Sequence, residues 1–215
     1  MDGTRNEPVV ASAIGSATEP RSEPGVEPGI ERRWPPGDLA LWIFILAELS
    51  VFAVFFAAYA FARAAQPALF EAAQQTLNRD TAFINTVALI TSSWLVVKAV
   101  AAIRADDARR CAHWLWAALA FGGLFILIKA AEYAEHIGNG ITLSTNLFYM
   151  FYLSLTFFHF MHVLLGMVIL AAVAVRARAG AYSAAGHDGV ESGASYWHMV
   201  DLVWLILVPL VYVMR

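Results

Sequence analysis

The residues that could do chemistry in this sequence are titratable side chains inside long apolar stretches. Glu48 lies in the run AELSVFAVFF, and His159 and His162 lie in the run TFFHFMHV. An ionisable group at bilayer depth costs about 2.5–3.5 kcal/mol on insertion scales, so a sequence that keeps several of them indicates a function there. The two histidines share one face of a helix, which is a spacing that a metal or a haem could use.

His198 and Asp201 repeat this three-residue spacing near the end of the chain. The two pairs together raise the hypothesis of one shared metal or haem site. Because a helix rises 1.5 Å per residue, His159 lies about 24 Å from the end of its stretch at Val175, and His198 lies about 3 Å from the start of its own stretch at Tyr196. These two ends are expected on the same side of the membrane. This mismatch in depth predicts that the two histidine pairs share no metal ion or haem and that the polar groups pair locally.

Lys129, Glu132 and Tyr133 form another cluster, because spacings of three and four residues put them on one helix face. The lysine and the glutamate can neutralise each other. We interpret them as an ion pair near the membrane surface, with the lysine ammonium reaching toward water. Glu132 is expected at the height of His159, which predicts a hydrogen bond between these two side chains, contributing about 0.6 kcal/mol.

Glu48 has no Lys or Arg three or four positions away. Two interpretations of its carboxyl stay open: a proton-linked or lipid-contacting group, or a structural hydrogen bond between helices.

Trp197 and Trp204 flank Asp201, and Trp197 is expected in the aromatic belt at the membrane surface. No segment supplies a nucleophile with a base, a phosphate loop or a complete metal shell, so we expect no catalytic site. Small and hydroxyl residues that allow helices to approach closely are interpreted as packing residues: Asn85, Thr86, Ser92 and Ser93.

Five apolar stretches must position these groups. They cover residues 39–62, 83–103, 114–133, 147–175 and 196–214. Each approaches or exceeds the roughly 20 residues that cross the hydrocarbon core of a bilayer. The chain is 60% hydrophobic and 14% charged, whereas soluble domains are about 25% charged. The sequence therefore predicts an all-α integral membrane protein with five transmembrane helices, of which the fourth is long enough to tilt or protrude.

The segments outside these stretches predict domain organisation and orientation. Residues 1–37 hold six of the eight prolines and are expected to be a disordered tail before a transmembrane domain at 38–215. The net charge of −3 makes nucleic acid an unexpected partner, and the single Cys111 excludes an internal disulfide.

The arginines at the ends of the apolar stretches predict the orientation in the membrane, because such residues gather on the cytoplasmic side. One side of the membrane is flanked by only three: Arg63, Arg79 and Arg215. This places the N-terminus inside and the C-terminus outside a bacterial inner membrane. The arginines on the other side are Arg32, Arg33, Arg104, Arg109, Arg110, Arg176 and Arg178.

The last apolar stretch reads YWHMVDLVWLILVPLVY. It resembles the YWHxVDxVW signature of the haem–copper oxidase subunit III family. Four other motifs follow in the family's order: SExxFF around Glu48, NTxxLLxSS from Asn85 to Ser93, QxxEY as KAAEY at 129–133, and HGxHV at His159–His162. The resemblance covers residues 38–215 and implies the five-helix form of the family.

This resemblance implies a non-catalytic subunit that binds no metal or haem itself. Such a subunit packs beside the catalytic subunit, which carries the haems with copper or iron. The resemblance also implies phospholipid in a cleft, support of proton uptake, and a place in the aerobic electron transport chain. In the family motif TGxHGxH, Thr156 is kept, but Phe157 and Phe160 replace both glycines. Two bulky rings should widen or fill that contact. This divergence resembles the accessory protein of bacterial nitric oxide reductases in denitrification, commonly called NorE.

A hypothesis from a different class also remains at this point. Glu48, His162 and Asp201 are the polar groups that an independent membrane transporter or proton channel would use. The absence of a convincing internal repeat disfavours an inverted-repeat transporter.

Overall fold

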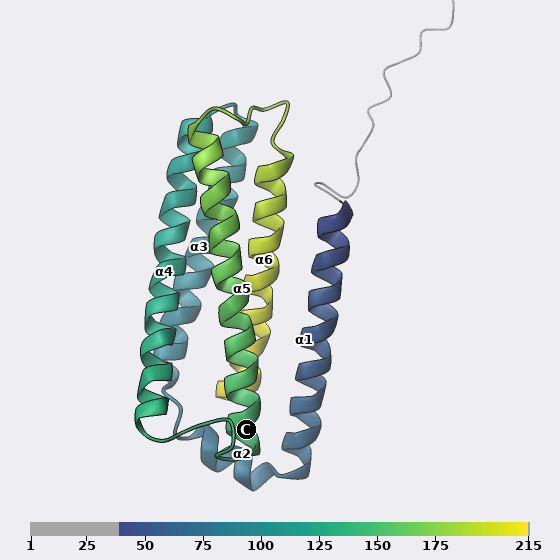
Figure 1. Cartoon of the computed structure of the whole chain (residues 1–215), viewed down its shortest axis with the longest axis vertical. Coiled ribbons are helices and arrows are strands. Elements are labelled where there is room, and N and C mark those ends of the chain that lie inside the picture. Colours follow the sequence, from purple (N-terminus) through teal and green to yellow (C-terminus); the bar gives the residue numbers. More distant parts are fainter. Residues whose placement is uncertain (1–38, 215) are drawn as a thin grey trace, which may run out of the picture. The chain divides into compact units, whose positions relative to one another are not determined.

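The structure is a computed structural model that describes residues 39–214, so the predicted tail at 1–37 lies outside the described residues. Five helices in this part are long and apolar enough to cross a membrane, which confirms the all-α fold with five spans. Figure 1 shows them as α1, α3, α4, α5 and α6. Their bounds are α1 (Leu39–Ala65), α3 (Arg79–Arg104), α4 (Ala108–Gly138), α5 (Leu147–Arg178) and α6 (Asp188–Val208).

Two short elements lie beside the spans. Helix α2 (Pro67–Gln74) begins at a proline, whose missing N–H has no partner to lose in a first helical turn. A π-helical turn, η1 (Pro209–Val213), continues α6. Gln74 joins the two elements, because its amide nitrogen donates to the carbonyl oxygen of Val211 at 2.8 Å. The sequence analysis expected no helix between the stretches 39–62 and 83–103, where α2 lies.

The helices extend beyond the apolar stretches because polar residues cap them. Asn78 accepts hydrogen bonds from the backbone of α3, Asp107 from that of α4, and Asn146 from that of α5. Such caps satisfy backbone N–H groups that a first turn leaves free. Helix α6 begins at Asp188, eight residues before the apolar run at Tyr196. Hydropathy alone therefore placed several helix ends too far toward the membrane centre.

Helices α3, α4, α5 and α6 form a closed bundle. Consecutive helices pack against one another, and α6 also packs against α3, which closes the ring. Helix α1 packs against α5 and α6, and α2 contacts α1 and α5 (Figure 1). Helix α1 buries only Ile45, Phe52 and Tyr59, so most of its surface faces the surroundings of the bundle.

Trp197 of α6 lies in the middle of this bundle and is fully buried. Its indole ring occupies the space beside Gly122 of α4 and Gly166 of α5, where an added Cβ would lie 2.9 Å from ring carbons in both cases. The prediction that Trp197 belongs to the surface aromatic belt is therefore wrong. The two glycines leave room for the ring, and burying its large apolar area is favourable.

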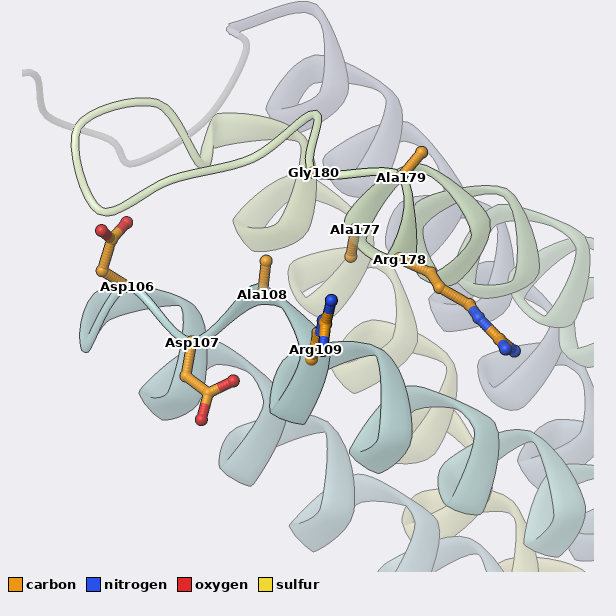
Figure 2. A pocket seen from close by; sticks show the side chains of 8 residues that line it. All are labelled: Asp106, Asp107, Ala108, Arg109, Ala177, Arg178, Ala179 and Gly180. Carbon is orange, nitrogen blue, oxygen red and sulfur yellow. The ribbon is translucent and has the colours of Figure 1, made fainter.

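One end of the bundle, which we call the arginine-rich end, carries Arg104, Arg109, Arg110, Arg176 and Arg178. An open hollow of about 530 Å³ lies there between the α3–α4 turn and the end of α5 (Figure 2). Asp106 has a φ of 62°, which is unusual for a residue with a Cβ. Its carboxylate accepts the N–H of Ala184 at 2.8 Å and so holds the α5–α6 loop.

Candidate functional site

Lys129 stands at the centre of a buried polar cluster near the opposite, α2 end. The residue has no exposed surface. Its Nζ donates to Glu132 Oε1 at 3.1 Å, to the Tyr212 hydroxyl at 2.7 Å and to the Tyr152 hydroxyl at 3.3 Å. Four aromatic rings also lie 5.1–5.7 Å from the ammonium: Tyr133, Tyr152, Trp204 and Tyr212. The prediction that this lysine reaches toward water is wrong, because α4 continues past it to Gly138 and the rings enclose it.

Glu132 ties three elements together in this cluster. Its Oε1 accepts hydrogen bonds from Tyr212 of η1 at 3.0 Å and from Tyr152 of α5. His136, one turn further along α4, has its Nε2 3.3 Å from the Tyr152 hydroxyl and is slightly exposed. The sequence analysis missed Tyr152, Tyr212 and His136. In the sequence the two tyrosines look like ordinary aromatic residues of an apolar stretch. Only their hydroxyl groups, which need hydrogen-bond partners when buried, could have indicated a polar cluster.

His159 does not take part in this cluster. Among the described residues neither of its ring nitrogens has a hydrogen-bond partner. The ring instead packs against Phe125 at 5.7 Å and is stacked on Trp204 at 5.0 Å. The predicted hydrogen bond between Glu132 and His159 is therefore wrong.

The true helix ends explain this error. Glu132 lies six residues before the end of α4 at Gly138, and Tyr152 lies five residues after the start of α5 at Leu147. At 1.5 Å per residue these positions lie about 9 and 8 Å from the same end of the bundle, so Tyr152 is level with the carboxylate. His159 is seven residues further along α5, about 10 Å deeper.

A second polar pair joins α1 to α5. Glu48 Oε2 lies 3.0 Å from His162 Nε2, and His162 Nδ1 lies 2.6 Å from the carbonyl oxygen of Phe158. Both side chains are partly exposed, and the ring of Phe52 packs on the imidazole at 5.2 Å. The helix–helix hydrogen bond that one interpretation of Glu48 required is thus present. The proton-linked interpretation stays a prediction.

A third polar group lies between α3 and α6. Ser93 Oγ is 2.7 Å from His198 Nδ1, and the same nitrogen is 4.0 Å from Asp201 Oδ2. The Asp201 side chain is 8% exposed, and within the described chain neither of its oxygens has a hydrogen-bond partner. A buried carboxyl without protein partners calls for a water molecule or an ion.

The two histidine pairs lie closer in depth than predicted, but they do not meet. Because α6 begins at Asp188, His198 lies ten residues, about 15 Å, from the start of its helix. His159 lies about 28 Å from the end of α5, so the gap is about 13 Å instead of about 20 Å. Within residues 39–214 no group of three or more His, Cys, Asp and Glu side chains could hold a metal ion.

Hydroxyl side chains of α3 contact the neighbouring helices. Thr86 Oγ1 accepts the indole N–H of Trp204 at 3.1 Å, and Ser92 donates to the carbonyl oxygen of Ala118 at 2.8 Å. Thr156 of α5 donates within its own helix, to the backbone carbonyl oxygen of Tyr152, at 2.6 Å. Asn85 is fully buried, and its amide has no hydrogen-bond partner among the described residues.

Comparison with known proteins gives a consistent result. The family model for cytochrome c oxidase subunit III matches residues 37–215. The chain belongs to this family. A cytochrome c oxidase subunit 3 of Synechocystis sp. is 36% identical over 173 residues, which are 80% of this chain and 73% of the relative. One of Thermostichus vulcanus is 34% identical over 82% of this chain and 86% of the relative. A probable subunit 3 of Rickettsia bellii is 32% identical over 80% and 66%, respectively.

The two phenylalanines that depart from the subunit III motif have different surroundings in this member. Phe160 packs edge-on against Tyr133 of α4, with ring centroids 5.8 Å apart, so it fills the contact between α4 and α5. Phe157 is exposed and walls an apolar hollow of about 650 Å³ at the α2 end, together with Tyr133 and Phe158. The first ring closes a contact between helices, and the second leaves a hollow open to the bilayer.

Proposed function

We propose that this chain is a non-catalytic accessory subunit of a respiratory haem–copper enzyme. It lies in a bacterial inner membrane beside the catalytic subunit that carries the haems with copper or iron. The observation that carries the proposal is the subunit III family match over residues 37–215, which includes all five spans. In this role the chain sustains proton uptake by its partner and aerobic electron transport.

The arrangement of the polar groups supports this role. The Lys129 cluster, the Glu48–His162 pair and the hydroxyls of α3 each join neighbouring helices. Interhelical contacts of this kind hold a bundle in one shape. A subunit that acts by presenting a fixed surface to a partner needs that rigidity. With the N-terminus inside, the arginine-rich end lies in the cytoplasm, as the bias of Lys and Arg predicts.

The test is co-purification from membranes with a tag on this chain. We expect a haem-containing catalytic subunit to elute with it, detected by haem absorbance and identified by mass spectrometry. The matched control is the same tag on a variant with Trp197→Ala, which removes the central packing ring and should lose the partner. If the intact chain elutes alone while a complete oxidase or reductase assembles without it, the proposal fails and the transporter hypothesis with Glu48, His162 and Asp201 gains ground.

A finer version of the proposal concerns the partner. Phe157 and Phe160 in place of two family glycines favour the NorE-type accessory protein of a nitric oxide reductase over a subunit of an oxygen-reducing oxidase. The same co-purification separates the two, because the catalytic subunits differ in sequence. The neighbouring genes give an independent answer, since the two enzymes have different operons. An oxidase catalytic subunit in the eluate would overturn the NorE version alone.

Phospholipid is the further partner that we propose. The 650 Å³ hollow beside Phe157 has a largely apolar lining and lies at the end of the bundle where α4 meets α5. An acyl chain fits this chemistry. Lipid analysis of the purified protein should find retained phospholipid that Ser154→Trp, which fills the hollow, reduces. Ser50→Trp on the exposed face of α1 is the control and should leave the lipid content unchanged.

A further inference from the structure

The groove between α3 and α6 has polar groups at both ends. It holds about 250 Å³ and is lined by Val97, Ala101 and Arg104 of α3 and by Glu191, Ser195 and His198 of α6. These positions repeat at helical spacing on two antiparallel helices. Over the seven residues from Arg104 to Val97 the groove descends about 10 Å from the arginine-rich end into the membrane.

The mouth of the groove is charged. Arg104 donates to Glu191 Oε1 through Nη2 at 2.7 Å and through Nε at 3.1 Å, and 61% of its side chain is exposed. His187 Nε2 lies 3.1 Å from the same carboxylate oxygen. This ion pair at the end of a span is in contact with the aqueous phase.

At its inner end the groove reaches His198, which lies beside a buried carboxyl whose oxygens accept no hydrogen bond within the described chain. His198 keeps 38% of its side chain exposed to the groove, while its Nδ1 faces Ser93 and Asp201. Asp201 is more than nine-tenths buried, and within the described chain its two oxygens accept no hydrogen bond. An exposed imidazole and an unsatisfied carboxyl inside a span are both costly in lipid but not in water.

The volume of the groove is sufficient for that water. One water molecule needs roughly 10–15 Å³ of such space, so a groove of about 250 Å³ has room for several waters. Ser195, His198, Arg104 and Glu191 offer them hydrogen-bond partners along the whole length. The 4.0 Å gap between Nδ1 and Oδ2 is one that a single water or hydroxyl can bridge.

We propose that this groove is a water-filled inlet that carries protons between the aqueous phase at the arginine-rich end and the Asp201 carboxyl, by way of His198. A groove hydronium gives its proton to Nε2 of the neutral imidazole. The Nδ1 proton then passes to the Asp201 carboxylate through the Ser93 hydroxyl or a bridging water, and the ring is left neutral in its other tautomer. The reverse sequence releases the proton. The role of this inlet in supplying protons to a catalytic subunit rests on the proposed function; its hydration does not.

The first test measures water in the groove on the full chain in membrane vesicles. Cys111 is fully buried, so the unmodified chain is the blank. Ser195→Cys places a thiol in the groove on α6, and Ala172→Cys places one on the exposed face of α5 at a similar depth from the arginine-rich end. Because only a hydrated thiolate reacts, a charged thiosulfonate should modify Ser195→Cys about tenfold or more faster. Equal rates for the two variants would overturn the inlet.

The second test follows the carboxyl by infrared spectroscopy. We expect a carboxyl band that appears on acidification, is absent in Asp201→Asn, and shifts in heavy water. Ala101→Phe, which fills the groove, should slow that shift by about tenfold or more because the route loses its water. Ala57→Phe on the exposed face of α1 is the matched control. A band that never responds to bulk acidity, or an exchange that Ala101→Phe leaves unchanged, also sinks the proposal.

These outcomes are separable from those of the co-purification. A dry groove in a chain that still binds its partner overturns the inlet alone. A hydrated groove in a chain that purifies alone keeps the inlet and removes its role in a complex. If Ser195→Cys reacts in the isolated chain but not in the complex, the partner subunit fills the groove, and the inlet is overturned in favour of a contact surface.

Discussion

Lys129→Met tests whether the buried cluster of α4 acts as one unit. The substitution keeps a long unbranched side chain in the cage of rings and removes only the ammonium. Glu132 is then left with the hydroxyls of Tyr152 and Tyr212 as hydrogen-bond donors. Its carboxyl is 8% exposed and has no other cation within 3.5 Å in the described chain.

The geometry sets the expected magnitude. Removing one member of a buried ion pair typically costs about 3–5 kcal/mol, because the other charge stays buried without compensation. By comparison, Tyr212→Phe removes three interhelical hydrogen bonds at about 0.6 kcal/mol each, so about 1.8 kcal/mol. Lys129→Met should therefore lower the free energy of unfolding by about twice as much as Tyr212→Phe.

The assay is a double-mutant cycle on unfolding in bicelles. It compares Lys129→Met, Glu132→Gln and the variant that carries both. The double variant buries no charge, so we expect it to be more stable than the sum of the single losses predicts, by about 2 kcal/mol. Additive losses within about 0.5 kcal/mol would show that the two charges do not compensate each other, and would refute the reasoning.

Three further predictions follow from the packing and the polar pairs. Gly166→Ala should lower the free energy of unfolding by about 1–3 kcal/mol, because its new Cβ would lie 2.9 Å from a carbon of the Trp197 ring. Gly123→Ala is the control and should be neutral, because the nearest atom to its Cβ is 3.9 Å away. Equal effects of the two substitutions in thermal unfolding would contradict the prediction. His159→Phe should cost less than about 1.5 kcal/mol, because the described contacts of the ring are with the aromatic rings of Phe125 and Trp204. A larger loss in the same assay would mean a hidden hydrogen bond. Glu48→Gln should keep insertion and stability near those of the native chain, because an amide can still bond the imidazole; unchanged oxidase or reductase activity in membranes would leave Glu48 a structural role only.

Local properties of the sequence were sufficient to predict several features. Hydropathy over about 20 residues gives a span wherever it occurs, because a chain in lipid must satisfy its backbone hydrogen bonds within the segment. The five crossings followed from this rule. The neighbourhood of Lys129 and Glu132 also followed, since a spacing of three residues on a helix fixes two side chains on one face whatever surrounds them.

Partners between helices were not predictable in the same way. Glu132 pairs with Tyr152 and Tyr212, and Glu48 pairs with His162. Each choice depends on how far one helix is shifted along its neighbour and how it is rotated. Capping residues outside the apolar runs set the shift, as the start of α6 at Asp188 shows.

The sequence by itself therefore determined the membrane class, the five spans, the family and the residues that carry charge inside the bilayer. Only the tertiary structure decided which of these residues meet, that Lys129 is enclosed and that Trp197 lies at the centre. The physical reason is that spans and helix faces arise from neighbours along the chain, whereas contacts between helices arise from packing, where glycines beside a single indole ring fix the approach of three helices at once.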